Sequence, residues 1–222
     1  MIQNVEISQG AIRQSKALSL TVSSIEDRLL NLPYSGEHLV KDPKVENLQL
    51  PSIALQFYSL VYATGTVPCD NDLVEAYLSQ EQHFSYVPSD KVEVNYLGSR
   101  TVVKLQSLIA RILRTYPSLV RDLHFYLMAY ESKLFDAVYY SVTNDFAKGV
   151  DLRVRHRQNW YDVALFLDTS RSIFFWQRKA KRHRRNNDRL INISLNPAEA
   201  QIVGPYMLYT HQHVQQLKHL ID

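Results

Sequence analysis

Asp151 and Asp162 are the residues of this chain whose type and spacing fit chemistry, because they lie in two neighbouring segments with alternating apolar residues. The segments, GVDLRVRH (149–156) and WYDVALFL (160–167), predict two strands of an antiparallel hairpin that turns at 157–159. The numbers of paired residues then sum to about 315, so Asp151 lies opposite Ala164 and diagonal to Asp162 on one face. Two carboxylates that converge in this way can bind Mg²⁺ or Mn²⁺, which prefer oxygen ligands. The same alternation is also typical of ordinary polar residues on the exposed face of a sheet.

A dense cluster of basic residues follows the second of these strands. From Arg171 to Arg189 there are eight Lys or Arg and one acidic residue, Asp188, so this basic segment (residues 171–189) carries +7. The chain has 25 Lys or Arg and 22 Asp or Glu, which leaves 17 basic and 21 acidic residues, or −4, for the rest. Charge focused in this way is typical of a protein that binds nucleic acid. The residues expected to contact phosphates are Arg171, Arg178, Lys181, Arg182, Arg184 and Arg185.

The composition argues against several classes of protein. An apolar fraction of 45% over 222 residues can bury a substantial core, and no run approaches the roughly 18 apolar residues of a membrane-spanning helix. The first residues lack the basic start and apolar run of a secretory signal, and a single Cys69 excludes an intrachain disulfide. Glycine is scarce, with 6 residues, and no GxxxxGK, GxGxxG or GxSxG motif occurs. We therefore expect a globular, cytoplasmic protein without a nucleotide-cradling loop or a serine-hydrolase elbow.

The elements predicted around the hairpin indicate an α+β fold. Helical periodicity, N-cap residues and proline breaks predict helices, while β-branched and aromatic runs between turn residues predict strands. The predicted helices are 23–32, 70–80, 101–116, 118–135 and 213–221, and the predicted strands are 90–98, 137–142, 149–156, 160–167, 189–196 and 202–209. Pro117 is expected to separate the two middle helices. The first hundred residues are therefore predicted to be mostly helical.

The basic segment fits two conformations. As a helix that begins after Asp168, it leaves Lys179 on the border of the face that packs. As a strand, it pairs Asp162 with Gln177, and Lys179 projects from the same face. Both conformations bring Lys179 towards the aspartates. The helix is favoured, because the basic run is long and has no alternation.

The order of these elements resembles the core of the PD-(D/E)XK nuclease superfamily, the restriction-endonuclease-like fold. A helix, a strand, a strand carrying Gly-Val-Asp, a strand, a helix and a strand follow one another over residues 118–210. Asp151 matches the first acidic position, and Glu131, or as second choice Asp136, matches the carboxylate that some members place on the preceding helix. The next position departs from the pattern, because Asp-Val-Ala at 162–164 has Ala where the superfamily has Lys.

A displaced lysine is a feature of some members of this superfamily. The resemblance therefore implies that Lys179, or Lys181 as second choice, supplies the missing lysine from the next helix. If the basic segment is a strand, the sequence Gln177-Arg178-Lys179 is instead a glutamine variant of the same signature.

The resemblance implies a metal-dependent nuclease that hydrolyses phosphodiester bonds, with DNA as the expected substrate, in restriction, repair, transposition or phage defence. Asp151, Asp162 and Glu131 would hold Mg²⁺ or Mn²⁺, and the lysine would orient the attacking water. Residues 101–222 would form the nuclease-like core. Residues 1–100 would recognise the substrate or a protein partner, and a homodimer is a further arrangement open to the chain.

Two other functions remain open at this point. The same fold with a decayed site would bind nucleic acid through the basic segment without cutting it. A structural or assembly protein would instead use a basic helix to dock on an acidic protein surface.

Overall fold

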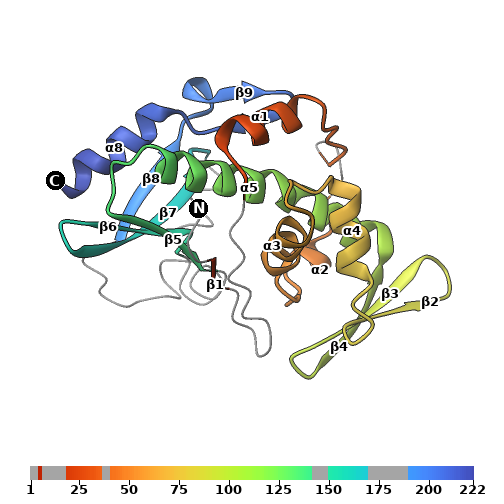
Figure 1. Cartoon of the computed structure of the whole chain (residues 1–222). Helices are drawn as coiled ribbons and strands as arrows, with labels where there is room; N and C mark the ends of the chain where they lie inside the picture. Colours follow the sequence, from red (N-terminus) through yellow and green to blue (C-terminus); the bar gives the residue numbers. More distant parts are fainter. Residues whose placement is uncertain (1–4, 7–18, 37–40, 142–149, 170–189) are drawn as a thin grey trace. The chain divides into compact units, whose positions relative to one another are not determined.

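The computed structural model describes residues 5–6, 19–36, 41–141, 150–169 and 190–222 (Figure 1). The chain divides into two compact units, residues 31–120 and a C-terminal unit that combines residues 1–30 with residues 121–222. The fold class is mixed α+β, as the sequence predicts. The predicted boundary at residue 100 differs from this division, because the N-terminal thirty residues group with the C-terminal strands. No helix among the described residues has the length and apolarity to cross a membrane.

The 31–120 unit holds three short helices and a three-stranded sheet. Its elements are α2 (Pro43–Glu46), α3 (Ile53–Thr64), α4 (Asp70–Leu78), β2 (Phe84–Val87), β3 (Lys91–Tyr96), β4 (Ser99–Lys104) and the first part of α5 (Leu105–Glu131). Local caps set the helix starts: Ser52 Oγ accepts the Leu55 N–H at 3.1 Å, and Cys69 and Asp72 cap each other's N–H groups at the start of α4. The strand predicted at 90–98 is β3, the middle strand of the antiparallel sheet.

Strand β4 corrects the prediction of a helix that starts at residue 101. Leu97 and Gly98 both have positive φ, at 52° and 75°, and form the tight turn of a hairpin between β3 and β4. Val103 is then buried opposite Val92. The β-branched residues that follow this turn favour the strand, so the helix α5 begins only at Leu105.

Helix α5 also corrects the prediction that Pro117 ends a helix. The helix runs from Leu105 to Glu131 with Pro117 inside it. Ser118, which directly follows the proline, donates its hydroxyl to the Thr115 carbonyl at 2.7 Å, as an interior helix residue does. An internal proline costs about 3 kcal/mol, but each buried large apolar side chain contributes about 1.5–3 kcal/mol. Buried side chains on both sides of the proline offset its cost: Leu108, Ile112, Tyr116, Leu119, Leu123 and Tyr126.

The C-terminal unit is built on a five-stranded sheet in the order β1-β5-β6-β7-β8 (Figure 1). Strands β5, β6 and β7 are antiparallel neighbours, whereas β8 is parallel to β7 and β1 is parallel to β5. The elements are β1 (Val5–Glu6), α1 (Val22–Leu30), β5 (Ala137–Ser141), β6 (Leu152–His156), β7 (Asn159–Leu167), β8 (Leu190–Leu195), the 3₁₀ turn η1 (Pro197–Glu199), β9 (Gln201–Val203), β10 (Tyr206–Leu208) and α8 (His211–Ile221).

One face of this sheet forms the core of the unit. Its buried side chains are Val138, Tyr140, Leu152, Val154, Val163, Ile193 and Leu195. Tyr126 of α5 meets Tyr140 edge to face with ring centroids 6.5 Å apart, so α5 covers this face (Figure 1). Residues that alternate with the buried ones therefore lie on the face opposite α5.

Residues 202–209, predicted as one strand, form a small hairpin of β9 and β10. Gly204 lies at its turn with φ of 54°, and a Cβ atom there would come within 2.6 Å of the Leu29 carbonyl oxygen. Only glycine fits both the backbone conformation and this approach to the end of α1.

A buried histidine joins α1, α5 and β9. His124 of α5 has no exposed surface, and its Nε2 lies 2.9 Å from Glu26 of α1, which also accepts a hydrogen bond from Gln201 of β9 at 3.0 Å. No hydrogen-bond partner for the buried His124 Nδ1 is present among the described residues. Protonation would place an N–H there without an acceptor, and burial lowers the pKa of His124 although Glu26 acts in the opposite direction.

Stability should therefore fall in acid. In the unfolded chain His124 titrates near its ordinary pKa of about 6.5. Because its folded-state pKa is lower, the unfolded state binds more protons, and the free energy of unfolding should decrease as the pH falls from about 7.5 through this value. Burial also lowers the pKa of His213, as it does that of His124.

The His124→Gln variant should show a smaller pH dependence in urea unfolding between about pH 7.5 and pH 5. The matched control is His219→Gln on the exposed surface of α8. Equal pH dependence in the wild type and in His124→Gln would contradict the role of the buried imidazole.

Candidate nucleic-acid interface

The hairpin of β6 and β7 has the register that the sequence predicts. Leu152 pairs with Val163 and Arg153 with Asp162, so paired numbers sum to 315. Arg157 and Gln158 form the two-residue turn, with φ of 48° and 67°. This register places Asp151, Arg153, Asp162 and Ala164 on the face opposite α5, because Leu152 and Val163 lie on the buried face.

Asp151 lies just before β6 and is only 8% exposed. Its N–H donates to the Val163 carbonyl at 2.9 Å, and its Oδ2 accepts the Leu165 N–H at 2.6 Å. The carboxylate thus satisfies a backbone donor of β7 at a position before β6 begins, since β6 starts at Leu152. Asp151 therefore has a structural role, and any ligand would have to share its carboxylate with Leu165.

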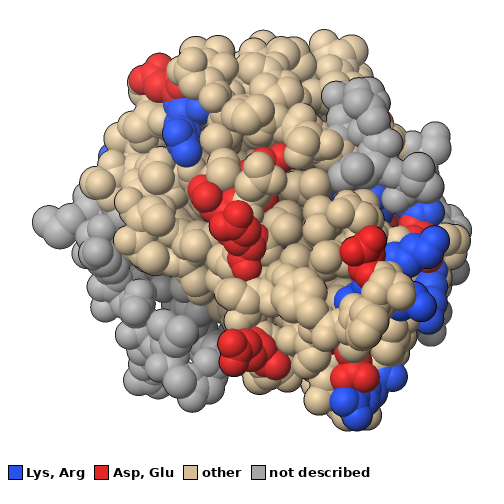
Figure 2. Space-filling view, turned by 90° about the vertical axis from the view of Figure 1, so that its right-hand side faces the viewer, with Lys and Arg blue, Asp and Glu red and all other residues tan. Residues whose placement is uncertain are grey.

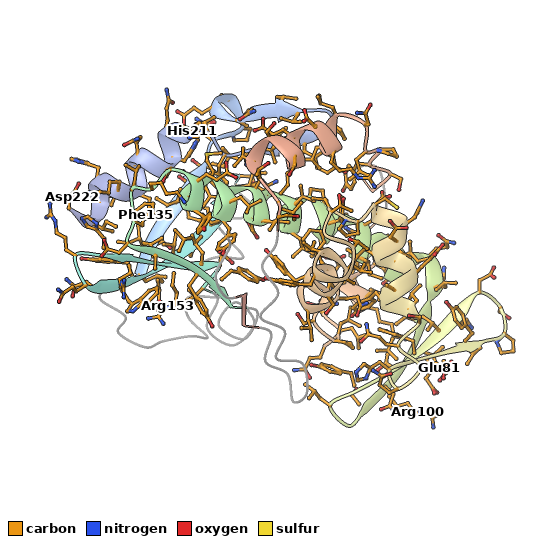
Figure 3. All side chains as sticks on the ribbon, in the orientation of Figure 1. Glu81, Arg100, Phe135, Arg153, His211 and Asp222 are labelled. Atoms are coloured by element: carbon orange, nitrogen blue, oxygen red, sulfur yellow. The ribbon has the colours of Figure 1, made fainter. Side chains whose placement is uncertain are left out.

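Asp162 is held by an arginine on the neighbouring strand. Arg153 Nε donates to Asp162 Oδ1 at 2.6 Å, and the side chains are 36% and 15% exposed, respectively. Figure 3 shows Arg153 on the side of the sheet away from α5. The cross-strand pair neutralises Asp162 on the same face as Asp151.

Two aromatic side chains accompany the arginines on this face. Trp160 of β7 pairs with Arg155 of β6, and Tyr139 of β5 pairs with Arg153. The guanidinium carbons of Arg153 and Arg155 lie 5.1 and 5.9 Å from the centroid of the Trp160 ring. Arg155 is exposed and Trp160 is half-buried. The face thus combines positive charge with aromatic surface.

Glu131 does not join the two aspartates. It is exposed at the end of α5, and its Oε1 accepts the N–H of Val22, the first residue of α1, at 2.9 Å. Asp136, the second choice, lies near the hairpin turn, and its Oδ2 is 3.4 Å from the Gln158 nitrogen. Among the described residues, no group of three or more His, Cys, Asp or Glu side chains is arranged to hold a metal ion.

The remaining predicted site residues lie outside the described residues. These are Lys179 and Gln177, proposed for catalysis, and the phosphate contacts Arg171, Arg178, Lys181, Arg182, Arg184 and Arg185. Whether the basic segment is a helix or a strand therefore stays a prediction.

The residues of this face that were not predicted from the sequence are Arg153, Arg155, Trp160 and Tyr139. A signal for the two arginines was present, because residues 151, 153 and 155 of one strand project on the same face at period two. The hairpin register extends this face to Trp160, which pairs with Arg155. The partner of Tyr139 depends on the register of β5 with β6, and the turn-like sequence between these strands, residues 144–149, is too long to set that register.

Comparison with protein-family models, with curated proteins and with solved structures found no match to this chain.

The two aspartates should differ in their effect on stability. Asp151→Ala leaves the Leu165 N–H without its acceptor and should lower the free energy of unfolding by about 1–3 kcal/mol. Asp151→Asn keeps an acceptor oxygen and should cost less. Asp162→Ala removes a partly exposed ion pair and should cost about 1 kcal/mol or less.

Urea unfolding of the three variants beside the wild type measures these differences. The structural role of Asp151 would be contradicted if Asp151→Ala were no less stable than Asp162→Ala.

Proposed function

We propose that the C-terminal unit of this protein binds nucleic acid. The observation that carries the proposal is the position of the basic segment, which has a charge of +7 and connects the neighbouring parallel strands β7 and β8. The sheet holds the described residues on both sides of this segment: the Asp168 N–H donates to the Leu195 carbonyl at 2.8 Å, and Leu190 pairs with Asp162. Eight cations thereby follow directly on β7, which carries Trp160 and pairs with β6, the strand of Arg153 and Arg155.

Elsewhere the charges of the chain are largely balanced. Without the basic segment the chain has a net charge of −4. Described cations often pair with a neighbouring carboxylate, as Arg100 does with Glu93 at 2.6 Å and Arg114 does with Glu46. In the view of Figure 2, the Lys and Arg side chains near the right edge lie beside Asp and Glu side chains, whereas the Asp and Glu side chains at the centre form a group of their own. The excess positive charge is therefore concentrated in the basic segment, where it can neutralise phosphates.

Binding to DNA should be strongly salt-dependent. Each neutralised phosphate contributes about 0.7 to 0.9 to the slope of log affinity against log salt. The triple variant Arg178→Gln/Lys181→Gln/Arg182→Gln should reduce the magnitude of this slope by about 2 to 3. Fluorescence anisotropy with a labelled oligonucleotide measures it.

The matched control removes three exposed cations from the 31–120 unit, in Lys91→Gln/Arg100→Gln/Lys104→Gln. The control should keep the wild-type slope. If both triple variants lower the slope equally, the cations of the basic segment contribute no more to binding than other surface cations do. The proposal then fails. If the wild type does not bind nucleic acid at low salt, docking on an acidic protein surface becomes the better explanation of the basic segment.

The register of β6 and β7 favours metal-dependent cleavage of nucleic acid as a second candidate function. It places Asp151 and Asp162 diagonally on one face. In addition, α5, β5, β6, β7 and β8 follow one another in the order that the nuclease resemblance implies, with a connection between the parallel strands where that fold has its second helix. Under this proposal, Asp151 and Asp162 act together with Lys179, Lys181 or Gln177 of the basic segment on DNA.

The described residues fit a metal ion only in part. Two carboxylates and substrate oxygens can suffice for Mg²⁺, but Asp151 already accepts a backbone N–H and Asp162 is bound to Arg153. Glu131, the predicted third carboxylate, caps α1 instead. The described part of the chain therefore does not form a metal site by itself, and a metal ion at Asp162 would have to share its carboxylate with Arg153.

Cleavage is tested with supercoiled plasmid, single-stranded DNA and RNA, each with Mg²⁺ or Mn²⁺ and with EDTA. If the protein is a nuclease, Asp151→Asn and Asp162→Asn should each lower metal-dependent cutting by at least about 100-fold. Asp168→Asn, at an exposed acid just beyond β7, is the matched control. Salt-sensitive binding without cutting by the wild type would leave the binding function and reject the nuclease.

A further inference from the structure

Four side chains form a cross-strand cluster on the sheet face opposite α5. They are Tyr139 of β5, Arg153 and Arg155 of β6, and Trp160 of β7, here called the Trp160 cluster. The rings of Tyr139 and Trp160 have centroids 6.5 Å apart and an interplanar angle of 75°. Both guanidinium groups lie within 6 Å of the Trp160 ring centroid.

The two arginines of the cluster differ in their charge balance. Arg153 is bound to Asp162 on the neighbouring strand. Arg155 is exposed, it makes no salt bridge to a residue that the structure describes, and its guanidinium lies against Trp160. The cluster thus presents an aromatic ring and a cation that no described carboxylate neutralises, side by side on two hydrogen-bonded strands.

We propose that the Trp160 cluster binds an unpaired base of single-stranded nucleic acid, with the base stacked against Trp160 and the adjoining phosphate bound by Arg155. This inference rests on the proposed nucleic-acid binding and names the class of nucleic acid. A nucleotide has the two features that the cluster complements, a planar aromatic group and a negative charge a short distance away.

The geometry favours a single strand over a duplex. In a duplex, each base is stacked on its neighbours and presents only its edge in a groove. An aromatic side chain on a sheet face can stack only on a base that is unpaired or turned out of the helix. Base readout in a groove depends on hydrogen bonds to base edges, whereas Trp160 offers a broad ring surface and a single N–H donor.

The experiment uses a Trp176→Phe background, because the chain has two tryptophans and this change leaves Trp160 as the sole reporter. The probes are an oligothymidylate of about 20 nucleotides, an abasic oligonucleotide of the same length, and a blunt duplex, all at about 50 mM salt. Oligothymidylate should quench Trp160 fluorescence, and the abasic strand should not. An oligouridylate of the same length separates the sources: stronger quenching by it assigns the ligand to RNA, and stronger quenching by oligothymidylate assigns it to DNA.

Substitution of Trp160 separates base stacking from phosphate binding. Trp160→Leu should weaken oligothymidylate binding by about 5- to 150-fold, as expected for loss of one stacked base, and leave abasic and duplex affinity within about twofold. Trp160→Phe, which keeps an aromatic ring, should restore most of the affinity. Tyr86→Leu, at an exposed aromatic residue of β2 in the other unit, is the matched control and should bind as the wild type does.

The outcomes distinguish this inference from the proposed function. If Trp160→Leu weakens binding to all probes equally, or to none, while binding remains salt-sensitive, then stacking is rejected and nucleic-acid binding stands. If the wild type binds none of the probes, the proposed function fails and the inference fails with it.

Discussion

The register of the β6–β7 hairpin is the constraint on which the rest of the C-terminal unit depends. It is set by a two-residue turn at Arg157 and Gln158, both with positive φ, between the paired residues His156 and Asn159. Side chains alternate with a period of two, so a slip of one residue would turn Asp151, Arg153 and Asp162 into the core. It would also expose Leu152 and Val163, which are now almost fully buried. The cost of that exchange fixes the face on which the charged residues lie.

Arg153 is central to the charge distribution on that face. It neutralises Asp162 and stacks near Trp160, so it links the acidic pair to the aromatic surface. While Arg153 holds Asp162, the face presents Arg155 and Trp160 to a ligand and offers little negative charge to a cation. Nucleic-acid binding as proposed is compatible with these contacts, whereas a metal ion would have to share the carboxylate of Asp162 with Arg153 and that of Asp151 with the Leu165 N–H.

Much of the sheet could be predicted from the sequence, because local signals agree there. Alternation and a polar turn predict β6 and β7 with the correct pairing, and the β-branched runs predict β5 and β8. The errors occur where tertiary contacts override local signals. Pro117 lies inside α5 because apolar residues on both of its sides are buried.

For the candidate site, the sequence predicts which acids share a face but not what they bind. The carboxylate of Asp151 bonds to the backbone of β7, and that of Glu131 bonds to the start of α1, a helix more than a hundred residues away in sequence. Neither contact leaves a periodic signal in the sequence. The grouping of residues 1–30 with the C-terminal strands depends on contacts of the same kind, such as the one between Glu26 and His124.

The most direct test of this account is to photo-crosslink the full chain to single-stranded DNA and to map the attached peptides by mass spectrometry. Under the proposed function, the basic segment and the sheet face opposite α5 both contact the nucleic acid. The account predicts cross-links to peptides from both the β6–β7 hairpin, with Trp160, and residues 171–189. Cross-links found only in peptides from the 31–120 unit would contradict it.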